Sequence, residues 1–288
     1  MNLCDMRTIK QIMGAFKLNF KKEYGQNFLT DCSVVEDIAD NCCDDETSTI
    51  LEIGPGIGTL TKELAERYKK VISLEIDDTL IPVLGYTLGE YNNVEIINRD
   101  VMKVDLHELL APYLKEGRVS VCANLPYYIT TPILMKLLED RVPFDYITIM
   151  IQSEVADRLC AKAGKSEYGA ITAVLNYYGE AEKLFVVPAD RFVPAPKVNS
   201  TVVRIRLHKE KPYNPVNEEI FFRTIRAAFE QRRKTLANAL SNGYPELSKD
   251  KITEIIEACG HRADIRGEKL STADFVVLSD KIYKEKNE

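Results

Sequence analysis

One short turn in the sequence carries side chains suited to holding a substrate. An apolar run, Val119 to Ala123, reads as a buried strand that ends at Asn124-Leu125-Pro126-Tyr127. Proline cannot donate to a sheet ladder, so the strand must stop here, and functional sites of α/β proteins lie at strand ends. The turn offers an amide, a rigid proline and an aromatic ring, but no His, carboxylate or thiol. It therefore suits a reaction whose nucleophile is held by oxygen acceptors and needs no titrating base.

A glycine-rich turn earlier in the chain predicts the second reactant. Gly54, Gly56 and Gly58 follow the strand-like TILEI and precede a helical segment, where bare backbone can approach a ligand closely. The dinucleotide fingerprint would need a glycine where Thr59 stands. The G-x-G-x-G spacing is instead typical of S-adenosylmethionine-dependent methyltransferases. Taken alone, the cluster could also be a simple tight turn.

Two acids at the ends of the next strands strengthen the cofactor interpretation. Glu75 ends VISLE and is placed to accept both ribose hydroxyls, and Asp100, after VEIIN, is placed to accept an adenine amino group. Either acid alone could be a solvated strand-end charge, but three such features on successive strand ends predict a site. The histidines at 107, 208 and 261 lack metal-ligand spacing, so no metal is expected.

Together these features predict methyl transfer to an adenine N6. That nitrogen is a poor nucleophile because its lone pair is conjugated into the ring, whereas a sulfonium donor leaves without acid assistance. The side-chain oxygen of Asn124 and the carbonyl of Leu125 would hold the amine in line. Tyr127 would stack on a flipped-out base.

The elements that must position these residues alternate along the chain. Strand-like TILEI, VISLEI, NVEIIN, VSVCA and YITIMI are separated by helical segments, including residues 30–45 with Thr30 or Asp31 as cap. This alternation predicts an α/β, Rossmann-like fold with a parallel, doubly wound sheet. LFVVP and STVVRIRL read as further strands. A polar, proline-bearing connection then separates a methyltransferase domain, 1–208, from a small helical domain, 209–288.

The composition sets the broad class. With 288 residues, 45% hydrophobic and 28% charged, the chain resembles ordinary soluble domains, and no apolar run reaches membrane-spanning length. No signal peptide is evident, so we expect a cytoplasmic protein whose seven cysteines are free thiols. The net charge of −6 argues weakly against nucleic acid as a partner, but two segments are locally basic. These are the N-terminal arm, residues 1–20 with the following lysines, and the segment Arg223 to Lys234, which has five cations and one anion.

Four motifs, in order and spacing, resemble the ribosomal RNA adenine N6-dimethyltransferase family. They are KKEYGQNFL, EIGPGIGTLT, NLPYYITTPI and FVPAPKVNSTVVRI, and the tail RTIRAAFEQRRKTLANAL looks like the bacterial small-subunit branch. The resemblance runs from about residue 21 to the C-terminus. It implies dimethylation of two adjacent adenines in the 3′-terminal hairpin of 16S rRNA during small-subunit biogenesis, with S-adenosylmethionine as methyl donor. The implied partner is the small ribosomal subunit or its precursor, and we expect a monomer with no membrane association.

The resemblance also implies roles for single residues. Gln26, Asn27 and Leu29 match the motif that closes over the methionine part of the cofactor, and Gly54, Gly56, Glu75, Asp100 and Asn124 match further cofactor contacts. Phe192 matches an aromatic that sandwiches the target adenine against Tyr127; on the residues alone it could equally be a core phenylalanine. The predicted catalytic set is therefore Asn124, Leu125, Tyr127 and Phe192.

The basic segment near residue 230 predicts an RNA-binding face. If the segment is one continuous helix, Arg223, Arg226, Arg233 and Lys234 fall within about a quarter of its circumference, at 100° per residue. Arg232 falls nearer the apolar side and is expected to pair within the protein. A solvated charged face is the usual fate of such a run, but charges of one sign favour phosphate contacts. Lys21 and Lys22 are assigned to the same RNA-binding role.

Two other functions remain open on the sequence alone. A large-subunit rRNA methyltransferase of the macrolide-resistance type shares the catalytic motifs, and the C-terminal region would have to distinguish it. A non-catalytic ribosome-assembly factor would keep the fold as an RNA-binding module, but loss of Glu75, Asp100 or Asn124 would be expected there, and all three are present. DNA adenine methylation is disfavoured because those enzymes typically open this motif with Asp.

Overall fold

The computed structural model describes residues 1–18 and 27–287, which divide into two compact units. The first consists of Met1–Ala156 with Glu182–Leu207, and the second of Asp157–Ala181 with His208–Glu288. The sequence predicts one boundary, near residue 208. The structure has that junction, and in addition groups residues 157–181 with the C-terminal helices.

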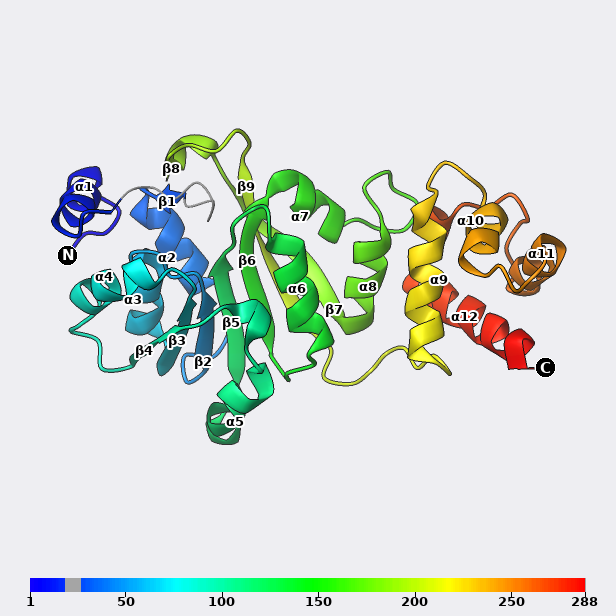
Figure 1. Ribbon diagram of the computed structural model, residues 1–288, viewed down its shortest axis with the longest axis horizontal. Coiled ribbons are helices and arrows are strands. Elements are labelled where there is room, and N and C mark those ends of the chain that lie inside the picture. Colours follow the sequence, from blue (N-terminus) through cyan, green and yellow to red (C-terminus); the bar gives the residue numbers. More distant parts are fainter. Residues whose placement is uncertain (19–26, 288) are drawn as a thin grey trace. The chain divides into compact units, whose positions relative to one another are not determined.

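The first unit is built on a seven-stranded sheet with the order β4-β3-β2-β5-β6-β9-β7 (Figure 1). Strands β2 to β6 pair in parallel, and β9 runs antiparallel to β6. This arrangement confirms the predicted Rossmann-like fold. The strands are β2 (Thr49–Ile53), β3 (Lys70–Glu75), β4 (Val94–Asn98), β5 (Val119–Asn124), β6 (Tyr146–Gln152), β7 (Gly179–Val187) and β9 (Ser200–Leu207).

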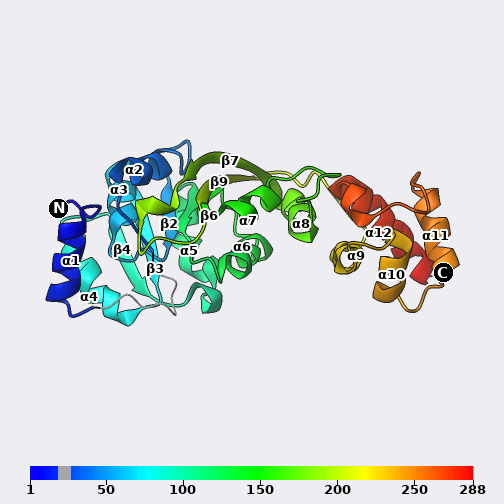
Figure 2. The same cartoon turned by 90° about the horizontal axis from the view of Figure 1, so that it is seen from above.

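The chain direction across the sheet explains where a ligand cleft must form. From β2 the chain moves outward to β3 and β4, and it then returns to β5 on the other side of β2 and continues to β6. Because parallel crossovers are right-handed, the helices of the two halves cover opposite faces. Figure 2 shows α2 and α6 on opposite sides of the sheet. The carboxyl ends of the adjacent strands β2 and β5 therefore flank the switch point, where ligands bind in open α/β sheets.

The helices of the first unit follow the predicted pattern with shorter bounds. Asp31 caps α2 by accepting a bond from the Ser33 backbone N–H at 3.1 Å, which confirms one of the two predicted caps. The helix ends at Asp40, before the predicted residue 45. The helices are α2 (Cys32–Asp40), α3 (Thr59–Arg67), α4 (Ile81–Thr87), α5 (Leu106–Glu116), α6 (Thr130–Glu139) and α7 (Ser153–Leu159), which runs into the second unit.

An N-terminal helix, α1 (Met6–Ala15), was not predicted. Its buried residues Ile9, Ile12 and Met13 form a cluster with Phe28, Ile57, Leu80 and Val83, so tertiary contacts hold this short helix in place. Asp5 caps it through the Thr8 backbone N–H at 3.1 Å.

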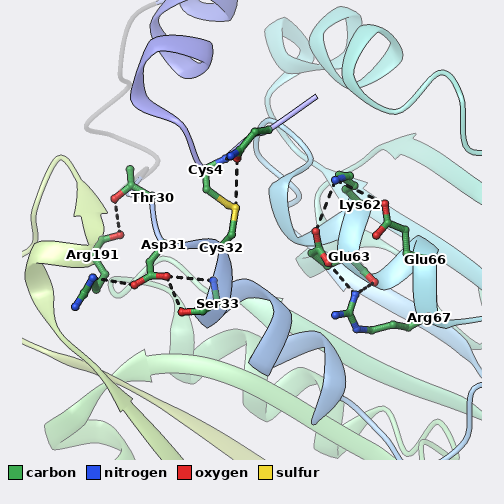
Figure 3. The surroundings of a disulfide bond; sticks show 11 residues. Cys4, Thr30, Asp31, Cys32, Ser33, Lys62, Glu63, Glu66, Arg67 and Arg191 are labelled. Carbon is green, nitrogen blue, oxygen red and sulfur yellow. Dashed lines mark hydrogen bonds and ion pairs between the residues drawn. A yellow bond between two sulfur atoms is a disulfide. The ribbon is translucent and has the colours of Figure 1, made fainter.

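The expectation that all cysteines are free thiols is wrong for two of them. Cys4, just before α1, forms a disulfide with Cys32, the first residue of α2, with the two Cα atoms 5.5 Å apart (Figure 3). Beside it, Arg191 pairs with Asp31 at 2.9 Å. No local sequence pattern signals this pair, because the contact depends on how α1 packs. The remaining five cysteines are free.

A second, two-stranded sheet connects distant motifs. Strand β1 (Phe28–Leu29) pairs antiparallel with β8 (Phe192–Val193), so that Leu29 lies opposite Phe192. The Thr30 N–H extends the pairing by donating to the Arg191 carbonyl at 2.9 Å. Phe28 and Leu29, the last two residues of the N-terminal motif, therefore lie beside the first two residues of the FVPAP motif.

The second unit is helical. It contains α8 (Ala170–Tyr178), α9 (Glu218–Glu230), α10 (Leu236–Gly243), α11 (Lys249–Ala258) and α12 (Thr272–Asn287). The Tyr177 ring of α8 lies 5.1 Å from the Phe221 ring and 5.4 Å from the Phe222 ring of α9, measured between centroids. This aromatic packing joins residues 157–181 to the C-terminal helices. No helix in the described chain has the length and apolarity needed to cross a membrane.

The prediction of one continuous helix through the basic segment is wrong. Helix α9 ends at Glu230, and Thr235 caps a new helix by accepting a bond from the Asn238 backbone N–H. Because a capping threonine takes an extended backbone, the helical periodicity cannot continue through it. Arg233 and Lys234 consequently lie in the turn between α9 and α10 and do not share a helix face with Arg223 and Arg226.

Candidate active site

A pocket in the first unit gathers the described residues that the sequence analysis assigned to catalysis and cofactor binding. It opens at the carboxyl ends of β2, β3 and β5, and the β1–β8 sheet contributes to its wall. The predicted residues in its lining are Asn27, Leu29, Gly54, Gly56, Glu75, Asp100, Asn124, Leu125, Tyr127 and Phe192. Gln26, Lys21 and Lys22 lie outside the described residues.

The glycine loop needs its glycines for conformation. Gly54, Gly56 and Gly58 have φ angles of 72°, 61° and 90°, in the left-handed region that side chains rarely adopt. At Gly58 a Cβ atom would also lie 3.0 Å from the Leu88 side chain. The loop leads directly into α3 at Thr59, so the positive end of the helix dipole lies beside the pocket.

The Glu75 carboxylate is held by the backbone on both of its oxygens. Oε2 accepts a bond from the Gly56 N–H at 3.2 Å, and Oε1 accepts one from the Asp77 N–H at 2.8 Å. Each oxygen keeps capacity for a second donor. Burial raises the pKa of Glu75, the Asp77 carboxylate raises it further, and the backbone bonds oppose these effects. The side chain therefore fits a ligand that offers two hydroxyl donors.

Asp100 also lies at the pocket with one oxygen engaged. Its Oδ1 accepts a bond from the Met102 N–H at 2.9 Å, which starts a short 3-10 turn over Val101–Lys103. Its Oδ2 lies 3.9 Å from the Lys103 ammonium. The half-buried carboxylate thus has accepting capacity for an amino group in the pocket.

The turn after β5 is fixed by its own backbone. The Leu125 N–H donates to the Met150 carbonyl at 3.3 Å, and the Pro126 carbonyl accepts bonds from the Ile129 N–H and the Thr130 hydroxyl at 3.2 and 3.1 Å. Helix α6 begins at Thr130, so strand and helix pin both ends of the turn. Asn124, at the strand end, is half-buried and lines the pocket.

Two aromatic side chains complete the wall. Burial raises the pKa of Tyr127, whose hydroxyl lies 2.7 Å from the Ser200 Oγ. Phe192 is 2% exposed, belongs to a hydrophobic core cluster and also lines the pocket, so both of its expected roles are compatible with its position. Tyr128, by contrast, is 62% exposed at the pocket.

Two residues of the site, Phe28 and Ser200, are not predicted from the sequence. The Phe28 ring carbon lies 3.4 Å from where a Cβ on Gly56 would stand, so it packs on the glycine loop and also lines the pocket. The only signal for it is its place between Asn27 and Leu29 in a motif already noted. Ser200 touches the site through a partner 73 residues away, which no local pattern reveals.

The predicted RNA-binding cations of the second unit differ in their surroundings. Arg223 donates to the Gly243 carbonyl at 2.6 and 3.0 Å and lies over the Tyr244 ring at 4.3 Å, so it is tied to α10. Arg226, Arg233 and Lys234 are exposed. Arg232 donates to the Ser166 and Tyr168 carbonyls at 2.6 and 3.1 Å, which confirms the expected internal pairing.

Comparison with known protein families shows which family the chain belongs to. A family model described as ribosomal RNA adenine dimethylase matches residues 17–275. The chain belongs to the ribosomal RNA adenine dimethylase family. Two curated relatives are both named ribosomal RNA small subunit methyltransferase A. One, from Alkaliphilus metalliredigens, is 45% identical over 273 residues and is covered over 95% of either chain. The other, from Bacillus thuringiensis, is 47% identical over 275 residues, with 94% coverage of each.

Solved structures support the same family fold. A dimethyladenosine transferase from Plasmodium falciparum superposes with a TM-score of 0.74 at 25% identity, over 90% of this chain and 98% of that one. A 23S rRNA methyltransferase, ErmE, superposes with a TM-score of 0.69 at 24% identity, over 89% and 99%. At that identity the second comparison shows the fold alone.

Proposed function

We propose that the protein transfers methyl groups from S-adenosylmethionine to N6 of two adjacent adenines in the 3′-terminal hairpin of 16S rRNA, giving dimethyladenosine. One observation carries the proposal: the amine-holding turn Asn124–Tyr127 lines the same pocket as the glycine loop, Glu75 and Asp100. A nucleophile held at the turn would therefore lie next to a cofactor held at the strand ends. The names of the curated relatives support the small-subunit substrate.

The residues present fit S-adenosylmethionine. Glu75 would accept the ribose hydroxyls on its two backbone-anchored oxygens, and Asp100 would accept the adenine amino group. Gly54 and Gly56 would let the backbone approach the ligand, with the α3 N-terminus nearby. Asn27 and Leu29 would contact the methionine part from the β1 side, as we also propose for Gln26. The cofactor supplies an electrophilic methyl group on a sulfonium whose positive charge is lost as the methyl leaves.

The protein's contribution to transfer is placement. The Asn124 side-chain oxygen and the Leu125 carbonyl accept the two N–H bonds of the adenine amino group and favour a pyramidal nitrogen with its lone pair directed at the methyl. Tyr127 and Phe192 hold the flipped-out base between two aromatic faces. Once the nitrogen is alkylated it becomes acidic and releases its proton to water, so a buried general base is unnecessary. A second transfer follows when the monomethylated amine returns and donates its one remaining N–H to one of these acceptors.

The RNA partner is the small ribosomal subunit or its precursor, and the protein acts in the cytoplasm as a monomer during subunit biogenesis. Arg226, Arg233 and Lys234, with Lys21 and Lys22, are assigned to phosphate contacts. Arg223 would support that surface by holding α10 in place. We propose no metal for the reaction, because a sulfonium donor leaves without acid assistance.

Transfer of radiolabelled methyl to undermethylated small subunits, large subunits and naked rRNA, followed by nucleoside analysis, tests the proposal. We expect dimethyladenosine only in small-subunit rRNA. Label in large-subunit RNA would identify a macrolide-resistance type of enzyme. Tight binding to small subunits without label would identify a non-catalytic assembly factor.

A further inference from the structure

The two aromatic walls of the proposed base slot come from different segments. Tyr127 follows β5, while Phe192 begins β8, in the loop between β7 and β9. Both line the pocket. For a base to fit between two rings, each ring must be held at a fixed position, because a stacking slot that opens or tilts misdirects the amine.

Ser200 holds the far end of the Tyr127 ring. Its Oγ lies 2.7 Å from the Tyr127 hydroxyl, and its own side chain is fully buried. Ser200 is the first residue of β9 and pairs with Gln152 of β6, so the sheet fixes its backbone. A tyrosine has two side-chain torsions, and a bond at the hydroxyl restrains both of them.

Asn199 holds the loop that carries Phe192. Its Oδ1 accepts a bond from the Ala189 N–H at 3.1 Å, near the start of the loop, and its carbonyl accepts a bond from the Ser153 N–H at 3.0 Å. The loop is therefore closed at its base, with Phe192 between the two joined points. Pairing of Phe192 with Leu29 restrains the loop at a third point.

We propose that the dipeptide Asn199-Ser200 positions both aromatic walls, with Ser200 orienting Tyr127 and Asn199 closing the Phe192 loop. The inference rests on the proposed function and deepens it, since it assigns two positioning residues that do not line the pocket themselves. It also explains why a polar pair stands where the FVPAPKVNS segment enters a buried strand.

The Ser200–Tyr127 bond predicts a specific non-additivity. Ser200→Ala leaves the hydroxyl of the half-buried Tyr127 without its Ser200 partner, so the ring shifts toward another partner. Tyr127→Phe removes the hydroxyl and keeps the stacking face. In the Tyr127→Phe background, Ser200→Ala leaves two apolar ends facing each other, an exchange that is nearly neutral.

The test is a double-mutant cycle measured as methyl transfer at saturating S-adenosylmethionine, on whichever rRNA particle the wild-type protein labels. We expect Ser200→Ala to lower kcat roughly tenfold with cofactor affinity within about twofold of wild type, because the slot is misaligned and the cofactor site is intact. Tyr127→Phe should cost about threefold, and adding Ser200→Ala to it less than about twofold more. Asn199→Ala should lower kcat whether or not the Tyr127 hydroxyl is present.

The matched control is Ser120→Ala, since Ser120 is an equally buried serine near the start of β5, whereas Tyr127 follows the end of that strand. Its kcat should equal that of wild type. Wild-type turnover in Ser200→Ala would overturn the orienting role of Ser200. So would a double variant whose fold-loss in kcat equals the product of the losses in Ser200→Ala and Tyr127→Phe. Loss of cofactor binding in parallel with kcat would show general unfolding of the site instead. Failure of the proposed function would appear separately, as wild-type protein that leaves small-subunit rRNA unlabelled.

Discussion

At the scale of single residues, the site depends on acceptors that are fixed before any substrate arrives. The backbone around Leu125 and Pro126 is pinned by β6 and by α6, and the Glu75 oxygens are pinned by two N–H groups. Preorganised acceptors of this kind need no rearrangement during the reaction. The consequence is that removing one acceptor should affect transfer far more than binding.

Asn124→Ala tests this consequence. We expect kcat to fall by at least about a hundredfold, since the lost oxygen acts on the amine where charge develops. The dissociation constant of S-adenosylmethionine, measured by calorimetry, should change only a few-fold because Glu75 and Asp100 remain. The melting temperature serves as the folding control. Turnover close to wild type in a folded variant would contradict the role of Asn124.

Glu52 is a buried carboxyl next to the glycine loop that offers a prediction about stability. It is 1% exposed, its Oε2 accepts a bond from the Ser73 hydroxyl at 2.7 Å, and its Oε1 has no hydrogen-bond partner within the described chain. Burial, aided by the Glu75 charge, raises the pKa of Glu52 from 4.5 to about 7, while the Ser73 hydrogen bond and the nearby Thr61 hydroxyl act in the opposite direction. The folded protein therefore binds this proton more tightly than the unfolded chain does.

The sign of the pH effect follows directly. The neutral Glu52 carboxyl makes its full contribution to the free energy of unfolding below the unfolded pKa of 4.5. This contribution is lost as the pH rises through about 7. The loss amounts to about 3 kcal/mol of unfolding free energy at most. Glu52→Gln should remove this part of the pH dependence in urea unfolding measured from pH 5 to pH 8. An unchanged slope in the variant would show that Glu52 is ionised throughout the range.

At the scale of elements, local patterns predicted strands better than helix ends. STVVRIRL forms β9 over Ser200–Leu207 because it is rich in β-branched residues, and its first four residues are all buried. Glu75, Asp100 and Asn124 could be placed from the sequence because they stand at or just beyond the ends of such strands. Helix α1 could not, since Ile57 and Leu80, which cover it, are distant in sequence. The break before Thr235 was not predicted, because the helical periodicity of the sequence runs through it. In the structure Thr235 adopts an extended backbone and caps the next helix.

The disulfide beside α1 gives a prediction at the same scale. Helix α1 packs on Phe28 and Leu80, both of which line the pocket, and Cys4–Cys32 closes a chain segment with a sequence separation of 28. Reducing it with a dithiol should lower the unfolding free energy by about 3.5 kcal/mol in the chain-entropy model. It should also weaken cofactor binding several-fold, since the wall behind the pocket loosens.

Cys4→Ser and Cys32→Ser provide the controls for the disulfide. Each variant should behave like the reduced protein and should not respond further to the reductant. Thermal melts and cofactor titrations with and without dithiol would measure both effects. Identical stability of the oxidised and reduced wild-type protein would show that α1 is held by its apolar contacts alone.

At the scale of the whole molecule, a chain of net charge −6 must bind a polyanion through local positive surface. Arg226, Arg233 and Lys234 are exposed in the second unit, whereas Arg223 is bound to Gly243 and Tyr244. Helical spacing alone grouped Arg223 with the exposed cations, because its carbonyl partner lies 20 residues further along the chain. The exposed three should therefore act through phosphates and Arg223 through folding.

Salt dependence separates these two roles. Replacing Arg226, Arg233 and Lys234 together by Gln should reduce the slope of log K against log salt for small-subunit binding by about 2 to 3, since each phosphate contact contributes roughly 0.7 to 0.9. The affinity loss should be largest at low salt and shrink as salt screens the wild-type contacts. Arg223→Gln should instead lower the melting temperature and leave the slope unchanged. The slope counts the phosphates that the protein neutralises, because each such contact releases counterions. An unchanged slope in the triple variant would therefore show that other residues make the phosphate contacts.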